Sequence, residues 1–301
     1  MPHKFDPRNQ HISIFIKDRI YPRSEAKVSV YDSSVQGGDA VWEGLRVYNG
    51  KIFFFWQHVD RLLESARTLA FTDIPSREFI RDAIFKTLET NGMKDGVHIR
   101  LTLTRGEKVT SGMDPRLNQK GSCLIVLAEW KPPVYDNENG IELITSHIIR
   151  NSPHFLDSKI HHNNLLNNIL AKIQANFCEA DDAIMLDSNG FVAETNATNI
   201  FMVKNNELYT PGTDACLPGI TRSVVIMLAK VLNIACYERN ISISEFYNAD
   251  EVFTSGTMGE ITKVNSIDGR IIDNRNKSDI TLRIYSRFKE LTRREGESLN
   301  F

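Results

Sequence analysis

Alternation of apolar and polar residues predicts the strands in the first half of the chain. Short apolar runs predict strands at Ile12–Ile16 and Lys51–Phe55. The segment Val97–Thr104 alternates at every position, which predicts a strand with one apolar and one polar face. The polar face carries His98 and Arg100. A strand face with these two side chains borders either solvent or a functional site.

Apolar residues at helical spacing predict the helices. His58–Phe71 and Ser76–Thr90 each carry an apolar stripe, and Asn91-Gly92 ends the second helix. In the second half, helices are predicted over about Asn163–Glu179 and Gly219–Leu232, and a further helix closes the chain. On the first of these, large apolar residues share one face: Leu166, Ile169, Leu170, Ile173 and Phe177.

A polar, proline-containing segment divides the chain. Lys131-Pro132-Pro133 opens a polar stretch between two predicted strands, and prolines there resist regular structure. A chain of 301 residues also exceeds the usual size of one compact domain. We therefore expect an α+β (mixed α/β) fold of two domains. The expected bounds are a small N-terminal domain over residues 1–130, a linker over 131–140 and a large C-terminal domain over 141–301.

The composition argues against several classes of protein. The formal net charge is −2, so no basic surface indicates a nucleic-acid or membrane partner. Apolar runs such as Cys123–Ala128 are too short to span a bilayer, and Met1–Gln10 lacks the apolar core of a signal peptide. The four cysteines are widely separated, which is typical of reduced thiols. We therefore expect a soluble, cytoplasmic protein.

Several sequence blocks in a fixed order carry the chemistry. They are Gly37–Gly50, His58–Leu62, Asp157–Lys159 with Asn163–Lys172, Gly190–Phe201, Leu217–Arg222 and Ala249–Ile261. In this order and spacing they resemble the fold-type-IV enzymes that use pyridoxal phosphate (PLP). That family includes branched-chain aminotransferases, D-amino-acid aminotransferases and aminodeoxychorismate lyases. The resemblance covers roughly residues 35–269.

The resemblance implies that Lys159 forms the Schiff base with PLP. A lysine that also acts as a base needs a pKa below the ordinary value of about 10.4. Lys159 lies at a predicted junction between strand and helix, among polar residues, where it could point into a cleft. The alternative is a solvated surface lysine, which describes most lysines.

The resemblance also assigns the other anchors of the cofactor. A carboxylate must keep the pyridine nitrogen protonated, and Glu194 takes this role; the alternative is a surface glutamate at a strand end. The phosphate needs a cation and backbone N–H groups, which a helix N-terminus supplies. Arg222 has suitable chemistry, but the family pattern assigns the cation to the first half of the chain. The expected phosphate ligands are Arg61, Ile220, Thr221 and Thr257.

Substrate contacts follow from the same resemblance. Trp42 matches an aromatic residue that lines the side-chain pocket. The turn at Thr257-Met258 is expected to bind the α-carboxylate through a hydroxyl and a backbone N–H. His98 and Arg100 stand where branched-chain enzymes carry a tyrosine and an arginine.

The chain departs from the family pattern at three places. Asn163-Asn164 stands where Asn-Tyr is usual, so Asn164 (or Asn163) is expected to replace the tyrosine that bonds the cofactor's 3-oxygen. Gly37 stands where an aromatic residue is usual, and His98 replaces a tyrosine. These changes leave the expected cofactor anchors in place and affect the expected substrate preference. The pair His161-His162 predicts no metal site, because adjacent side chains do not converge on one ion.

The expected activity is transamination through Lys159. The amino donor is expected to be a branched-chain L-amino acid and the acceptor 2-oxoglutarate. The resemblance also implies a homodimer with the active site between the two domains. Three alternatives remain: a transaminase for D-amino acids or (R)-amines, a lyase that breaks a C–C bond as aminodeoxychorismate lyase does, and a PLP-binding protein without turnover.

Overall fold

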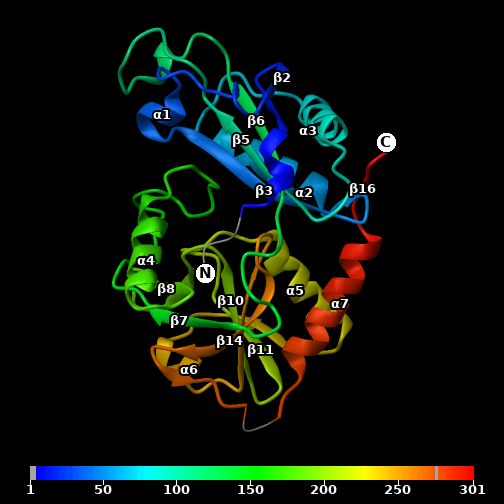
Figure 1. The fold of residues 1–301 in the computed structure, drawn as a ribbon. Helices are drawn as coiled ribbons and strands as arrows, with labels where there is room; N and C mark the ends of the chain where they lie inside the picture. Colours follow the sequence, from blue (N-terminus) through cyan, green and yellow to red (C-terminus); the bar gives the residue numbers. More distant parts are fainter. Residues whose placement is uncertain (1–4, 275–276) are drawn as a thin grey trace. The chain divides into compact units, whose positions relative to one another are not determined.

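Two compact units make up the chain in the computed structural model, which describes residues 5–274 and 277–301 (Figure 1). Both units contain helices and strands. No helix in the described part of the chain is long and apolar enough to cross a bilayer. Unit 1 consists of the chain up to Pro132 with Ile160–Asn164 and Thr292–Phe301, and unit 2 consists of Pro133–Lys159 and Leu165–Leu291.

Unit 1 is built on a seven-stranded antiparallel sheet in the order β16-β4-β3-β5-β6-β1-β2. Its helices α2 and α3 pack on this sheet and share its apolar core. The elements are η1 (Pro7–His11), β1 (Ser13–Ile16), β2 (Arg19–Pro22), α1 (Ser33–Gly37), β3 (Ala40–Tyr48), β4 (Lys51–Ile52), α2 (Phe55–Thr68), α3 (Arg77–Asn91), β5 (Val97–Thr104), η2 (Pro115–Leu117), β6 (Cys123–Trp130) and β16 (Glu297–Ser298).

The strand β5 confirms the predicted bounds and the predicted alternation. Its apolar residues are fully buried beneath α2 and α3. The polar face is not a solvent face, because His98 is 7% exposed and Arg100 is half-buried. Of the two surroundings expected for this face, the structure therefore excludes bulk solvent.

The predicted strand over Lys51–Phe55 is wrong beyond Ile52. Phe54 has a left-handed backbone (φ 46°) that ends the extended chain, and α2 begins at Phe55. Phe53 and Phe55 are buried, so their apolar side chains serve the core at a helix start rather than a strand. The second helix, α3, begins where Ser76 caps the N–H of Phe79 and ends at a left-handed Gly92, as predicted.

The segment Ile160–Asn164 belongs to unit 1, whereas the expected C-terminal domain over 141–301 included it. It runs along the start of β3: the N–H of Trp42 donates to the carbonyl of His161, and the N–H of Asn163 donates to the carbonyl of Ala40. Strand β4 pairs with the other end of β3, so the two segments share that edge of the strand. The C-terminal strand β16 joins the same unit by pairing with β4.

Unit 2 contains a nine-stranded mixed sheet in the order β12-β11-β10-β13-β14-β7-β8-β9, with β15 beside β14. Three of its pairs are parallel, namely β11 with β12, β14 with β7 and β7 with β8. The elements are β7 (Ile141–Thr145), α4 (Leu166–Phe177), β8 (Asp182–Leu186), β9 (Val192–Thr195), β10 (Asn199–Lys204), β11 (Glu207–Thr210), α5 (Ile220–Val231), β12 (Cys236–Glu238), α6 (Ile243–Tyr247), β13 (Glu251–Gly256), β14 (Glu260–Ile267), β15 (Arg270–Ile271) and α7 (Ile280–Arg294).

Helix α4 presents its large apolar residues to the outside. Leu166 is 74% exposed and Phe177 is 85% exposed. The helix instead packs on β8 through Ala171 and Ala175, which are fully buried. Alanine lets a helix approach a sheet closely, so the apolar stripe seen in the sequence faces away from the core of unit 2.

Gly106 is required by the turn that follows β5. Its φ is +101°, and a Cβ there would lie 1.8 Å from the carbonyl oxygen of Gly121. We expect Gly106→Ala to lower the free energy of unfolding by about 2 kcal/mol or more, because it adds a clash to backbone strain.

Urea unfolding followed by circular dichroism measures this loss. Gly37→Ala is the matched control, since nothing lies within 4 Å of its added Cβ; a change within about 0.5 kcal/mol is expected. Equal unfolding curves for the two variants would contradict the prediction.

Candidate active site

In unit 2, Glu194 on β9 is a buried carboxylate held by three donors. Nε of Arg150 donates to Oε1 at 2.6 Å, and the side-chain amide of Asn199 donates to Oε2 at 3.2 Å. The backbone N–H of Leu217 donates to Oε1 at 3.3 Å. Both members of the Arg150–Glu194 pair have side chains only 7% exposed. A surface glutamate, the alternative weighed from the sequence, does not describe this residue.

The protonated form of Glu194 is more favoured in the protein than it would be in water. Burial raises the pKa of Glu194, and the charge of Arg150 opposes the rise without cancelling it. A raised pKa makes a carboxylate a stronger acceptor for a proton on a neighbouring base. This is the property that a partner for a heterocyclic nitrogen needs.

The turn before α5 is tied directly to Glu194. Asn199 donates to the carbonyl of Leu217 at 2.9 Å as well as to Glu194. It packs so closely on Gly219 that an added Cβ would lie 2.1 Å from its Oδ1. Helix α5 then begins at Ile220 without a side-chain cap. The N–H groups of a first helical turn have no partner within the helix, so this turn can bind an anion.

Lys159 lies in an exposed turn of unit 2, where its N–H donates to Oδ1 of Asp157 at 2.9 Å. Cys216, immediately before Leu217, lies within electrostatic range of both Lys159 and Glu194. Burial and the charge of Glu194 raise the pKa of Cys216 to about 12, and the charges of Arg222, Arg150 and Lys159 oppose the rise. The charge of Lys159 therefore reaches the segment that precedes α5.

Thr257 and Met258 form the tip of a hairpin between β13 and β14. Gly256 pairs with Glu260 across the turn, and Glu260 has a left-handed φ of 59°. The carbonyl of Met258 accepts the N–H of Val134 at 2.9 Å, which fixes the tip against the start of unit 2. The hairpin therefore presents a hydroxyl and two backbone N–H groups in one partly exposed turn.

Arg222 serves the packing of unit 2. Its side chain is 4% exposed, and Nη2 donates to the carbonyl of Pro211 at 2.8 Å and to Glu238 at 2.7 Å. These contacts anchor the first turn of α5 to β12. They agree with the family pattern, which gives the phosphate cation to another residue.

In unit 1, the carboxylate of Glu43 on β3 is fully buried and accepts hydrogen bonds from side chains of α2 and from His161. Arg61 donates from Nε to Oε1 at 2.7 Å and from Nη2 to Oε2 at 2.8 Å. Nδ1 of His58 lies 2.7 Å from Oε2, and Nδ1 of His161 lies 3.0 Å from Oε1. Burial opposes ionisation of Glu43, but the charge of Arg61 and these hydrogen bonds hold its pKa well below the usual range.

Trp42 lies in a stack with two of the other candidates. The guanidinium carbon of Arg100 is 3.4 Å from the Trp42 ring centroid, and the ring of His161 is 4.1 Å from it. Burial lowers the pKa of Arg100 to about 10, which still leaves the guanidinium charged at neutral pH. Asn163 completes the arrangement by accepting from Nη2 of Arg100 at 3.0 Å.

His98 is neutral and lies among cations. Burial lowers its pKa to about 3, and the charges of Lys131, Arg46 and Arg100 act in the same direction. Within the described part of the chain, Nε2 of His98 has no hydrogen-bond partner. That nitrogen lies 3.3 Å from where a Cβ on Gly44 would be. A polar group aimed at a glycine surface suits contact with a ligand.

The two asparagines after Lys159 have different surroundings. Asn163 contacts Arg100, whereas Nδ2 of Asn164 donates to the carbonyl of Gly38 at 2.9 Å. This bond joins the end of α1 to the segment that follows Lys159. It gives no support to the expected role of Asn164 at the cofactor.

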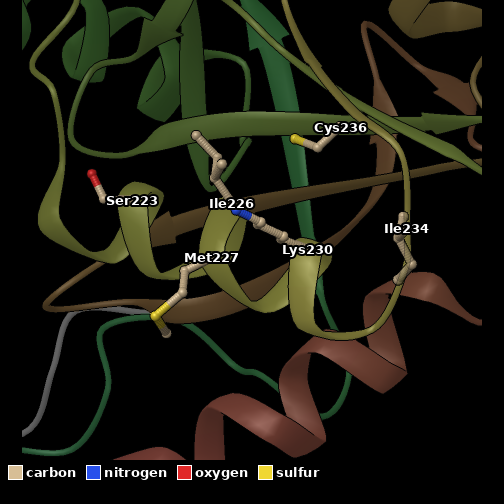
Figure 2. Close-up of a pocket in the computed structure, with 6 residues that line it drawn as sticks. All are labelled: Ser223, Ile226, Met227, Lys230, Ile234 and Cys236. Atoms are coloured by element: carbon tan, nitrogen blue, oxygen red, sulfur yellow. The ribbon is translucent and has the colours of Figure 1, made fainter.

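A hollow of about 490 Å³ in unit 2 lies on the later turns of α5 (Figure 2). Figure 2 shows a largely apolar lining with one serine, Ser223, and one lysine, Lys230. None of the candidate residues lines it. The lining residues are Ser223, Ile226, Met227, Lys230, Ile234 and Cys236.

Residues 40–267 match the family described as amino-transferase class IV. The chain belongs to the class IV aminotransferases. The matched region includes every candidate residue named above, from Trp42 to Met258. The family resemblance and the mixed fold expected from the sequence are thereby confirmed.

Two relatives and one solved structure illustrate the similarity. The chain is 59% identical over 290 residues to branched-chain-amino-acid aminotransferase-like protein 2 of Arabidopsis thaliana. The match covers 96% of this chain but 52% of that one, so the chain spans about half the length of this relative. It is 40% identical over 287 residues to a putative branched-chain-amino-acid aminotransferase of Methanocaldococcus jannaschii, covering 95% and 98% of the two chains.

The solved structure is the branched-chain aminotransferase of the thermophilic archaeon Thermoproteus uzoniensis with norvaline. It superposes with a TM-score of 0.87 at 30% identity, covering 95% of this chain and 96% of that one. This class IV aminotransferase therefore shares its fold with that branched-chain aminotransferase.

Sequence patterns do not single out Arg150, Asn199 or Glu43. A carboxylate buried at Glu194 requires a nearby cation, but the sequence does not say which one supplies it. A glutamate within the apolar block Gly37–Gly50 is the signal for Glu43. Asn199 gives no such signal, since its role arises from its close contact with Gly219.

Replacing Arg150 tests the pairing of Glu194. Arg150→Met removes the charge that opposes the raised pKa of Glu194. A carboxyl whose folded pKa is raised stabilises the fold below its unfolded pKa and loses that contribution as pH rises through the folded pKa. We expect Arg150→Met to lower the free energy of unfolding by about 3–5 kcal/mol at pH 8 and by less at pH 5.

Urea unfolding of the cofactor-free protein at both pH values measures the difference. The matched control is Arg150→Met with Glu194→Gln, which leaves no charge to bury and is expected to show little dependence on pH. An equal loss at pH 5 and pH 8 in the single variant would count against the ion pair.

Proposed function

We propose that this class IV aminotransferase uses PLP to transfer the amino group of a branched-chain L-amino acid to 2-oxoglutarate. The names of the relatives support the reaction and the substrate class. The observation that carries the proposal is the buried Glu194 held by Arg150 and tied to the start of α5. An ionisable group is buried in this way at a cost that function usually explains.

The residues of unit 2 fit the chemical groups of PLP. The raised pKa of Glu194 suits a proton shared with the pyridine nitrogen. The uncapped start of α5, at Ile220 and Thr221, suits a phosphate, and the hydroxyl of Thr257 adds a donor. Among the described residues, the buried Oγ of Ser255 has no hydrogen-bond partner, and Ser255 pairs directly with Asn199 across the sheet. A polar ligand beside Asn199 would satisfy it.

Bound PLP would supply an aldehyde for the amine and a ring that withdraws electrons from the reacting carbon. Lys159 would hold the cofactor through its amine, and the same amine would serve as the base that takes the proton from the substrate's α-carbon. Glu194 would keep the ring nitrogen protonated. Arg61, with the start of α5 and Thr257, would hold the phosphate so that the reacting carbon stays in place.

The substrate contacts use the remaining candidates. The turn of Thr257 and Met258 would donate a hydroxyl and a backbone N–H to the α-carboxylate. Trp42, fixed by its stack with Arg100, would line the side-chain pocket. The charge of Arg100 and the neutral ring of His98 suit the second carboxylate of 2-oxoglutarate better than an apolar side chain.

The absorption spectrum of the purified protein tests the proposal. A visible band from bound PLP is expected, and L-leucine with L-glutamate as a second donor is expected to bleach it. Lys159→Ala is expected to lose the band and at least about 10³-fold in transamination rate, because the amine that attaches the cofactor is gone.

Other outcomes separate the alternatives. Bleaching by D-alanine or a chiral (R)-amine, and not by L-leucine, would assign the enzyme to that donor class. A band that no donor bleaches would favour the lyase or a protein without turnover. A colourless protein that binds no added PLP would overturn the proposal.

We also propose that the enzyme is a cytoplasmic homodimer. Large exposed apolar patches often mark interaction sites, and five large apolar side chains of α4 between Leu166 and Phe177 are exposed. The one charged residue of α4 is Lys172, which donates to the backbone carbonyl of its neighbour Asp181. A second copy of α4 would therefore meet an apolar face without charge repulsion. The free thiols of all four cysteines suit a reducing compartment.

Light scattering after size exclusion measures the mass of the enzyme in solution. Leu166→Asp with Phe177→Asp is expected to convert a dimer to a monomer, because it places two charges on the paired faces. Ile271→Asp, at a residue that is 78% exposed elsewhere in unit 2, is the matched control and should keep the dimer. A monomeric wild type would contradict the homodimer, and a dimeric double variant would contradict the role of α4.

A further inference from the structure

Glu43 is the most completely paired charge in unit 1. Its side chain has no exposed surface, and four donor atoms surround its two oxygens. An ionised carboxyl group offers about four lone-pair positions, so all of them are used within the protein. Glu43 therefore has no position left for a substrate or a cofactor, and its role has to be exerted through its partners.

Arg61 is the partner of Glu43 that is proposed to bind the cofactor phosphate. Glu43 binds the edge of the guanidinium formed by Nε and Nη2 with two nearly equal bonds, of 2.7 and 2.8 Å. Two parallel bonds fix both the position and the plane of a guanidinium. The orientation in which Arg61 meets a phosphate is then set before the phosphate binds.

The two histidines donate hydrogen bonds to Glu43 but carry no positive charge of their own. Burial lowers the pKa of His58, and it lowers the pKa of His161 to about 4. Both rings are thus neutral at pH 7 and donate from Nδ1 to the carboxylate. One net ion pair, Glu43 with Arg61, remains at the centre of the cluster.

We propose that Glu43 is a positioning residue that holds Arg61 in the orientation that binds the phosphate of the cofactor, with His58 and His161 fixing Glu43 in turn. This inference rests on the proposed function, because it takes Arg61 as the phosphate cation. His161 also lies two residues after Lys159 in the chain, so the same carboxylate fixes the segment that follows the lysine.

A comparison of two ligands isolates the phosphate. PLP and pyridoxal share the ring and the aldehyde, but pyridoxal has no phosphate. Absorbance titration of cofactor-free protein gives a dissociation constant for each, and their ratio measures what the phosphate contributes. We expect Glu43→Gln to lower the preference for PLP over pyridoxal by about tenfold or more, while the affinity for pyridoxal stays within about threefold.

Combining variants tests whether Glu43 acts through Arg61. Arg61→Gln alone is expected to lose the preference, and adding Glu43→Gln to it should change the preference no further. Independent, multiplying effects of the two changes would overturn the inference. If Glu43→Gln fails to fold, Glu43→Asp serves in its place, because it keeps the charge but withdraws the carboxylate by one methylene and is expected to lower the preference partly.

A matched control separates positioning from general loss of stability. Glu251 is a buried glutamate of unit 2 that accepts the N–H groups of Ile280 and Thr281 at the start of α7. Glu251→Gln is expected to lower stability and to leave the ligand preference unchanged. If Glu43→Gln behaves in the same way, with affinity for both ligands falling together, Glu43 only stabilises the fold.

The wild type separates this inference from the proposed function. A wild type that binds no PLP contradicts both. If the wild type and Arg61→Gln behave as expected but Glu43→Gln keeps the preference for PLP over pyridoxal, only the role of Glu43 is overturned.

Discussion

A carboxylate removed from water has to be compensated by nearby donors, and this constraint shapes the polar part of both units. Glu43 in unit 1 and Glu194 in unit 2 are each almost fully buried. Each is paired with one arginine and is completed by neutral donors. Around Glu43, Arg61 is itself a candidate for the cofactor phosphate, and Glu194 is a candidate whose donors, Arg150 and Asn199, are not. The charge that must be compensated thus also determines where those side chains lie.

The two carboxylates differ in the direction of their pKa shift, and the difference follows from the donors. Glu43 receives two bonds from Arg61 and one from each histidine, and its pKa is held well below the usual range. Glu194 receives one bond from Arg150 and longer bonds from Asn199 and Leu217, so burial prevails and its pKa is raised. A permanently ionised Glu43 suits a fixed ion pair. A carboxyl group whose pKa is raised suits exchange of a proton with a ligand better than one in water.

Regular elements were the part of the fold that sequence could predict. The bounds of β5 and the ends of α3 follow from alternation and capping residues, which are local signals. The start of α2 at Phe55 does not, because Phe53 and Phe55 are equally apolar in a strand or at a helix start. The outward face of α4 could not be predicted either. Its packing through Ala171 is a property of the sheet beneath it.

The candidate site was predictable to the extent that its residues carry their own chemistry. Lys159 and Glu194 stand out through sequence blocks, and both lie within electrostatic range of Cys216 in unit 2. Arg150 and Asn199, which hold Glu194, contribute through distance and direction. Those quantities depend on where β10 and the segment after β7 lie relative to β9, which a linear pattern does not contain.

Two of the departures from the family pattern, Asn163 and His98, lie beside Arg100. Asn163 accepts from Arg100, Arg100 stacks on Trp42, and these side chains all lie in unit 1. His98 stands where the family has a tyrosine, so a neutral imidazole ring lies beside Arg100 in place of a phenol. The unit 2 residues proposed to hold the cofactor follow the family pattern instead. Because substrates differ in their side chains while a shared cofactor does not, we expect these changes in unit 1 to affect the choice of substrate more than the chemistry of unit 2.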